Sequence, residues 1–96
     1  DSADLYELII NIYTGLLHSN DNEDLIRYME HQLSNFGLKV INETGILYDS
    51  RIHISVGTVK ANHKSQHNKV ESIIKVGLLR SDETVITSAQ VTKYKF

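Results

Sequence analysis

The chain contains no cysteine, no proline and no tryptophan among its 96 residues. Without cysteine it cannot form disulfides or thiolate-ligated zinc and iron–sulfur sites, and we expect a cytoplasmic protein. Without proline, its turns must be built from Gly, Asn, Asp and Ser. No apolar run approaches the roughly 20 residues that a membrane-spanning helix needs, so we expect no membrane partner.

The charged side chains are unevenly distributed along the chain. Residues 1–48 have a net charge of −6, and residues 49–96 have a net charge of +4. This break predicts an acidic helical part followed by a mildly basic β part. A charge of +4 without a concentrated patch does not indicate a nucleic-acid-binding domain, and we expect no nucleic-acid partner.

Residues 3–18 are predicted to form an amphipathic helix with a wide apolar face. Two adjacent stripes make up this face: Leu5, Ile9, Ile12 and Leu16 in one, and Tyr6, Ile10, Tyr13 and Leu17 in the other. A face of this width predicts packing against more than one neighbour.

A second short helix is predicted between Asn22 and Phe36. Its apolar face is marked by Leu25, Met29, Leu33 and Phe36, at steps of four, four and three residues. Gly37 stands where a left-handed residue ends many helices. Residues 1–37 are therefore predicted to form a helical hairpin.

From Leu38 the apolar period changes to two, which predicts strands. "LKVI" is a short strand, and in the next segment Ile52, Ile54 and Val56 face one way while Arg51, His53 and Ser55 face the other. The phase then slips to Val59, which predicts a bulge at Gly57.

Residues 69–79 are predicted to form one strand with Val70, Ile74, Val76 and Leu78 on a common face. A hairpin turn at 80–83 and two more strands complete five or six strands within residues 38–96. The predicted fold class is α+β, with a helical hairpin followed by a small antiparallel β module.

Two clusters of polar residues are candidates for chemistry. Asp49, Arg51 and His53 lie within five residues, but no nucleophile accompanies them, so we interpret them as a turn that leads into a strand. His63 and His67 stand four apart in a polar loop without an obvious third ligand. We expect no enzyme activity, no metal and no cofactor; a metal-dependent hydrolase built on His53, His63 and His67 is a minor alternative.

The ordered set of segments is more specific than any single motif. "NFGLKVINETG" is followed by "YDSRIHISVGTVKA" and then by "VESIIKVGLLRSDETVITSAQV". This order resembles the GrpE family, the nucleotide exchange factors of DnaK-type chaperones. The positions that match the family pattern are Phe36, Gly37, Val40, Ile41, Asp49, His53, Val56, Gly77, Val85, Ile86, Ala89 and Val91.

The sequence also departs from the family pattern. The family's aspartate–proline is Asp49-Ser50 here, and its glycine–tyrosine is Gly77-Leu78. Its "R-V-L-R-P-A" is replaced by "T-V-I-T-S-A" at residues 84–89. These changes concern the contacts with the chaperone more than the fold.

The resemblance implies a homodimer in which two helical hairpins form a four-helix bundle and each β module contacts the ATPase domain of a DnaK-type chaperone. The dimer-interface residues that we expect are Leu5, Ile9, Ile12, Leu16, Met29 and Leu33. The chaperone-binding residues that the resemblance implies are Ile74, Arg80, Glu83 and Thr84. The expected function is promotion of ADP release; the alternative is a dimeric adaptor that has lost exchange activity.

Overall fold

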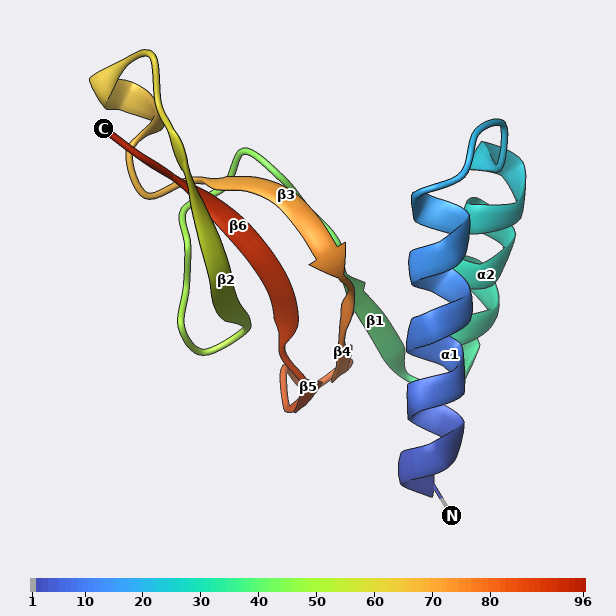
Figure 1. Cartoon of the computed structure of the whole chain (residues 1–96). Coiled ribbons are helices and arrows are strands. Elements are labelled where there is room, and N and C mark those ends of the chain that lie inside the picture. The colour runs from blue at the N-terminus through green and yellow to red at the C-terminus, as the bar shows by residue number, and fades with distance from the viewer. Residues whose placement is uncertain (1) are drawn as a thin grey trace.

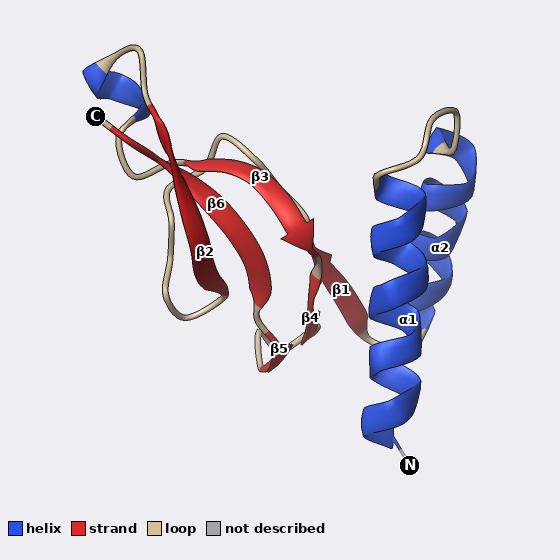
Figure 2. Ribbon diagram, in the orientation of Figure 1, coloured by secondary structure: helices blue, strands red, loops and turns tan. Residues whose placement is uncertain are grey.

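The computed structural model describes residues 2–96; Asp1, the first residue of the predicted hairpin, lies outside the described part. Two helices, α1 (Ser2–Leu17) and α2 (Glu23–Asn35), stand side by side at one end of the molecule, and a β module extends away from them (Figure 1). The six strands and one short 3-10 helix are β1 (Leu38–Ile41), β2 (His53–Lys60), η1 (Lys64–Gln66), β3 (Val70–Lys75), β4 (Gly77–Arg80), β5 (Val85–Thr87) and β6 (Ala89–Lys95). The predicted α+β class is confirmed (Figure 2).

The strands form two three-stranded sheets, in the orders β1-β4-β5 and β2-β6-β3. The first sheet is antiparallel throughout, but in the second β6 pairs parallel with β2 and antiparallel with β3. The prediction of a wholly antiparallel module was therefore wrong. A parallel pair needs a long connection, and the chain from η1 to β5 provides it.

The single strand predicted over residues 69–79 is divided between the two sheets. At the break, the backbone N–H of Val76 leaves the ladder and donates to Oγ1 of Thr14 on α1, at 3.1 Å. At Gly77, the next residue, the chain passes very close to the end of β5 and the start of β6. A Cβ on Gly77 would lie 2.6 Å from both the carbonyl oxygen of Thr87 and the nitrogen of Ala89. Glycine is required by this approach.

The faces of β3 also differ from the prediction. The register of its pairing with β6 shifts between Val70 and Ser72 and again between Ile73 and Lys75. These irregularities bury Ile73 and leave Ile74 45% exposed, whereas the simple alternation had grouped Ile74 with the buried Val70 and Val76.

Two local turn predictions are confirmed. Gly37 has a φ of +72° directly after α2, and the register of β2 shifts between Ser55 and Gly57. The strand itself begins at His53, because Asp49 to Ile52 form a turn in which the carbonyl of Asp49 accepts from the N–H groups of Ile52 and His53.

One apolar core joins the helical hairpin to both sheets. Its fully buried members are Ile10, Tyr13, Leu33, Leu38, Ile41, Val70, Ile73, Val76, Leu78, Leu79, Ala89 and Val91. The predicted stripe of α1 that contains Ile10 and Tyr13 faces this core, and Ile9 of the other stripe also packs against it. Among residues 2–96, no helix is both long and apolar enough to cross a membrane.

Candidate functional site

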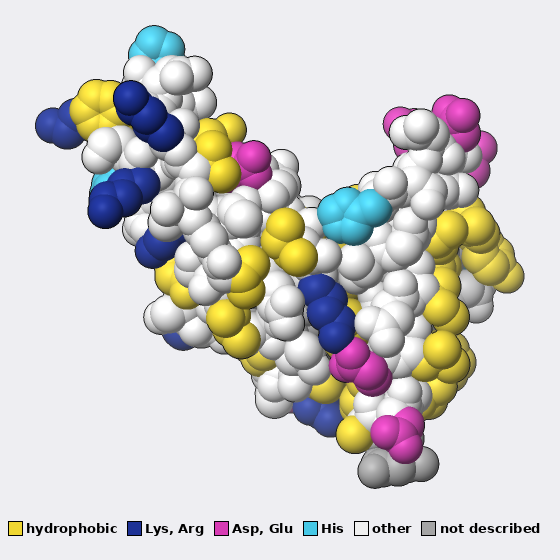
Figure 3. All heavy atoms as spheres, viewed as in Figure 1, with side chains coloured by type: hydrophobic (Ala, Val, Ile, Leu, Met, Phe, Trp, Pro, Cys, Tyr) yellow, Lys and Arg dark blue, Asp and Glu magenta, His cyan; other side chains and the backbone are white. Residues whose placement is uncertain are grey.

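The stripe of α1 that contains Leu5 and Ile12, together with Leu8 and part of α2, forms an exposed apolar surface, which we call the hairpin face. Its most exposed members are Leu5, Leu8 and Ile12 of α1, Leu25 and Tyr28 of α2, and Phe36 directly after α2. Hydrophobic side chains follow the outer edge of the helices in the space-filling view (Figure 3). Contiguous exposed apolar surface of this kind marks a contact with another molecule.

The six predicted dimer-interface residues are not equally accessible. Leu5 and Ile12 are 56% and 48% exposed, and Ile9, Leu16 and Met29 are half-buried at the margin of the hairpin face. Leu33 is buried within the chain and packs into the common core.

An open apolar groove of about 710 Å³ continues from the hairpin face toward the β module. It lies between α1, the end of α2 and the turn after β4, and it is lined by Leu5, Tyr6, Ile9, Gln32, Leu33, Phe36, Gly37, Leu38, Arg80, Ser81 and Asp82. The N–H of Ser81 donates to the carbonyl of Gly37 at 2.9 Å and so fixes the turn against the end of the hairpin.

The predicted chaperone-binding residues fall into two separate places. Arg80, Glu83 and Thr84 belong to the β4–β5 turn, which is closed by a hydrogen bond from the Arg80 N–H to the Thr84 carbonyl at 2.8 Å. Ile74 lies on β3, in the other sheet. The structure brings the three turn residues together and leaves Ile74 apart from them.

The turn is fixed by local hydrogen bonds rather than by burial. The Asp82 carboxylate accepts from the Thr84 N–H at 3.0 Å, and hydrogen bonds from the side chain and the backbone of Thr84 lower the pKa of Asp82. Glu83 adopts a left-handed φ of +72° and pairs with Lys39 of β1 at 3.4 Å, with both side chains exposed. The turn therefore carries a carboxylate directly before Thr84, the residue that stands where the family pattern has its first arginine.

Ile74 lies next to the junction between the β module and α1. Its carbonyl is 3.4 Å from Nε2 of His18, and the following residue, Lys75, forms an ion pair with Glu7. These contacts and the Thr14–Val76 hydrogen bond hold β3 against α1.

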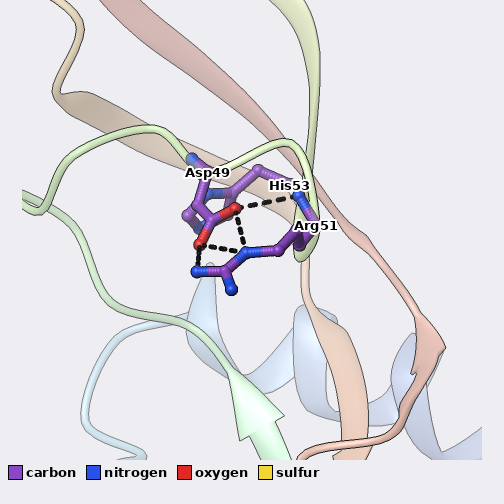
Figure 4. Close-up of polar contacts among 3 residues, drawn as sticks. All are labelled: Asp49, Arg51 and His53. Carbon is purple, nitrogen blue, oxygen red and sulfur yellow. Dashed lines mark hydrogen bonds and ion pairs between the residues drawn. The ribbon is translucent and has the colours of Figure 1, made fainter.

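The cluster of Asp49, Arg51 and His53 is shown in Figure 4. The Asp49 carboxylate faces the Arg51 guanidinium, with Oδ2 2.8 Å from Nη2, and it also accepts from the Arg51 backbone N–H at 2.9 Å. These hydrogen bonds lower the pKa of Asp49 to about 2. Its carboxylate is thus engaged by Arg51 and not by the imidazole.

His53 is held differently, by the backbone. Its Nδ1 accepts from the Asp49 N–H at 3.0 Å, so the neutral ring carries its proton on Nε2. The side chain is 1% exposed, its ring stacks on Tyr48, and Nε2 has no partner within the described chain. Burial lowers the pKa of His53. With Nδ1 occupied and Nε2 enclosed, the ring supports the turn and cannot exchange protons with a substrate there.

The other histidines are not gathered around His53. Within residues 2–96, no group of three or more His, Cys, Asp or Glu side chains is arranged to hold a metal ion. Nδ1 of His67 accepts from the backbone N–H of Phe96 at 3.1 Å, which ties the last strand to the segment after η1.

One surface was missed by the sequence interpretation. Ile54 and Val56 share a face of β2, as the alternation predicts, but they are 53% and 52% exposed, while His53 on the other face is buried. The apolar side of this strand therefore points outward. The phase slip at Gly57 was the only sequence signal of this arrangement.

Neither the models of known protein families nor the curated proteins include a match to this chain.

Proposed function

We propose that this chain is a GrpE-like co-chaperone of the cytoplasm. Two copies associate through their helical hairpins, and each β module binds the ATPase domain of a DnaK-type chaperone in its open state. ADP release is thereby accelerated without any covalent step. The observation that carries the proposal is the agreement between the order of the GrpE-like segments in the sequence and the order of the elements, a helical hairpin followed by a small two-sheet β module.

The hairpin face supports the dimer. A lone hairpin leaves Leu5, Leu8 and Ile12 in water, and a second hairpin would cover them in a four-helix bundle. Full burial of each such side chain is worth about 1.5–3 kcal/mol relative to exposure. A symmetric contact also suits a surface that is apolar across both helices.

The exchange reaction follows from linkage between two binding equilibria. A partner that binds the open ATPase domain more tightly than the closed one weakens nucleotide binding by the same factor. The contact residues that the proposal uses are Ile74 on β3 and Arg80, Glu83 and Thr84 in the β4–β5 turn. The turn is rigid enough to serve as a contact because its backbone and Asp82 close it locally.

A dimeric adaptor without exchange activity is the second candidate. The ion pair between Glu83 and Lys39 favours it, since Glu83 and Thr84 occupy the part of the turn where the family pattern has an arginine. Such a protein would keep the fold and the dimer while binding a chaperone, or another partner, without opening its cleft.

The decisive experiment is stopped-flow release of a fluorescent ADP analogue from a DnaK-type chaperone of the same organism. The proposal expects release to accelerate and then saturate as this protein is added. Ile74→Asp should lose the acceleration while keeping the helical and strand content and the dimer mass.

Leu47→Asp is the matched control for that variant. Leu47 is 64% exposed on the segment before β2, and the same change of an apolar side chain to an acid should leave release unchanged there. If the wild-type dimer binds the chaperone without accelerating ADP release, the adaptor function is favoured. Equal release with wild type and Ile74→Asp would remove Ile74 from the contact.

A further inference from the structure

The sheet β2-β6-β3 has one face against the core and one face toward solvent, which we call the outer face. Ala89 and Val91 of β6 are fully buried on the inner face, so Gln90, Thr92 and Tyr94, which alternate with them, lie on the outer face. Ile54 pairs with Gln90 and Val59 pairs with Tyr94, which assigns both to the outer face.

The bulge in β2 makes the exposed apolar side chains continuous. Ile54 and Val56 are two residues apart and share the outer face, but Val59 is three residues beyond Val56 and would point inward in a regular strand. The extra residue at the Ser55–Gly57 shift corrects the phase, and Val59 stays on the outer face with an exposure of 37%. Ile54, Val56 and Val59 form a stripe, the β2 stripe.

Strand β3, at the opposite edge of the same sheet, contains a similar irregularity. Ile73 pairs with Val91 and Lys75 with Gln90, which leaves Ile74 as an extra residue on β3. Ile74 is 45% exposed beside the row that contains Gln90 and Ile54. The β2 stripe and Ile74 thus flank the polar side chains of β6.

The charges around the sheet are almost all of one sign. No Asp or Glu occurs from Ser50 to Val70 or from Thr84 to Phe96, and these segments contain Arg51, Lys60, Lys64, Lys69, Lys93 and Lys95. The basic side chains gather at the end of the module that carries the C-terminus (Figure 3). The single acid of these three strands, Glu71, is held by the hydroxyls of Ser72 and Thr92, which lower its pKa.

The five lysines in this region have no acidic partner within residues 2–96. The described ion pairs of the chain involve Arg27, Lys39, Arg51 and Lys75 instead. Lys93 rests over the ring of Tyr48, 4.4 Å from its centroid, on the inner side of the sheet. Lys69 lies opposite the outer-face Tyr94, whose N–H donates to the Lys69 carbonyl, so the charge of Lys69 is free to meet a partner.

From these observations we infer that the outer face is a docking surface for the chaperone's ATPase domain, and that the β2 stripe meets an apolar patch on that domain with the lysines meeting an acidic rim. The inference rests on the proposed function and adds Ile54, Val56 and Val59 to the contact residues, with Lys69, which lies opposite Tyr94 and therefore on the outer face. The apolar stripe supplies affinity, and the lysines supply orientation and rate of association.

The composition of the stripe favours a protein over a polyanion. Isoleucine and valine neither stack on bases nor donate hydrogen bonds to phosphate. Single-strand binding surfaces depend on several aromatic side chains beside the basic ones, whereas Tyr94 is the one aromatic side chain that strands β2, β6 and β3 place on the outer face. Three aliphatic side chains in a row instead match the apolar centre of a protein–protein contact.

The test is the affinity of the full chain for a nucleotide-free DnaK-type chaperone, measured by isothermal titration calorimetry. Ile54→Thr/Val56→Thr keeps β-branched side chains in the strand and removes much of their apolar surface. We expect binding to weaken by about tenfold or more, since loss of roughly 1.4 kcal/mol corresponds to a factor of ten. Lys69→Glu should weaken binding more at about 50 mM than at about 300 mM salt.

Val40→Thr is the matched control. It makes the same change of valine to threonine on β1, in the other sheet, where Val40 is half-buried. Its affinity should equal that of the wild type. Circular dichroism and light scattering of each variant check that fold and oligomeric state are kept.

The outcomes separate the inference from the function on which it rests. Wild-type binding with equal affinity of the Ile54→Thr/Val56→Thr variant overturns the docking surface and leaves the proposed function standing. No binding and no acceleration by the wild type overturns the proposed function and the inference with it. Binding of a fluorescent single-stranded DNA that depends on the same residues overturns the assignment to a protein partner.

Discussion

The backbone N–H of Asp49 donates to Nδ1 of the buried His53 ring at 3.0 Å, so the turn before β2 depends on a neutral imidazole. Protonation of the ring would place a hydrogen on Nδ1 and replace this bond by a repulsive contact. Burial disfavours the charged ring, and the neighbouring Asp49 carboxylate opposes that effect only in part, so the pKa of His53 is lowered.

This relationship predicts a loss of stability in mild acid. Because the folded pKa of His53 lies below the ordinary value of about 6.5, the unfolded chain binds more protons between the two values. The contribution of the neutral His53 ring to the free energy of unfolding is complete above a pH of about 6.5 and is lost as the pH falls below this value. The slope for one proton is at most about 1.4 kcal/mol per pH unit.

Urea unfolding between neutral pH and mildly acidic pH measures this effect. His53→Asn retains a side-chain oxygen that accepts a hydrogen bond and removes the titrating ring, so its unfolding free energy should vary less over this range. The same pH dependence in wild type and His53→Asn would show that another group is responsible. Asp49 is not that group, because its pKa of about 2 confines its titration to lower pH.

Removal of the Tyr13 hydroxyl should destabilise the junction of helices and sheet. The buried hydroxyl donates to the Glu30 carboxylate at 2.6 Å and accepts from the Asn42 amide at 2.7 Å. Burial and the Glu30 carboxylate raise the pKa of Tyr13 far above its usual range, so the hydroxyl keeps its proton. Tyr13→Phe should cost about 1–3 kcal/mol in chemical denaturation.

Tyr28→Phe is the control for that change, since Tyr28 is 61% exposed and loses no buried hydrogen bond. Its unfolding midpoint should stay within the error of the wild type. A Tyr13→Phe protein as stable as Tyr28→Phe would mean that Glu30 and Asn42 find equivalent partners.

Two glycine substitutions should have opposite effects on stability. A Cβ on Gly77 would meet backbone atoms of Thr87 and Ala89 at 2.6 Å, and these atoms cannot move without opening the sheet. Gly77→Ala should therefore cost roughly 1–3 kcal/mol or more. Gly15 lies within α1, where an added methyl group would meet nothing within 4 Å, and Gly15→Ala should stabilise by about 1 kcal/mol.

Thermal unfolding of both variants checks this pair. Their midpoints should move in opposite directions from that of the wild type. A stabilised Gly77→Ala variant would contradict the close approach of β4 to the connection between β5 and β6.

Ile12→Asp should separate the proposed dimer into monomers. Ile12 is 48% exposed in the single chain, so its replacement leaves the protomer core intact while burying a carboxylate in the bundle. Size-exclusion chromatography with light scattering should give the 10.9 kDa mass of one chain. Asn11→Asp adds the same charge on a neighbouring exposed position and should remain a dimer; an unchanged dimer for Ile12→Asp would exclude the hairpin face as the interface.

Features governed by neighbouring residues were predictable from the sequence. Strand β1 begins and ends where "LKVI" predicts, Gly37 takes its left-handed conformation after α2, and the phase slip at Gly57 marks a real bulge. Each depends on a few adjacent residues whose conformational preferences agree.

Features governed by distant contacts were not predictable in this way. The break at Val76 depends on Thr14, 62 residues earlier, and the parallel pairing of β2 with β6 depends on where the chain re-enters the sheet. The exposure of Ile54 and Val56 shows the same limit, because alternation separates two faces without telling which one meets the core.

The central position of β6 has a consequence for the order in which the protein folds. Within residues 2–96, β2 has no hydrogen-bonded sheet partner other than β6, and β3 has other backbone hydrogen bonds only at Val70, with Gly45 and Ile46. During synthesis this sheet therefore cannot be completed until Ala89 to Lys95 have left the ribosome. The helical hairpin and β1 emerge long before then. Ile73 therefore lacks its partner, Val91 of β6, until that strand arrives, and such non-local pairing makes this step slow relative to helix formation.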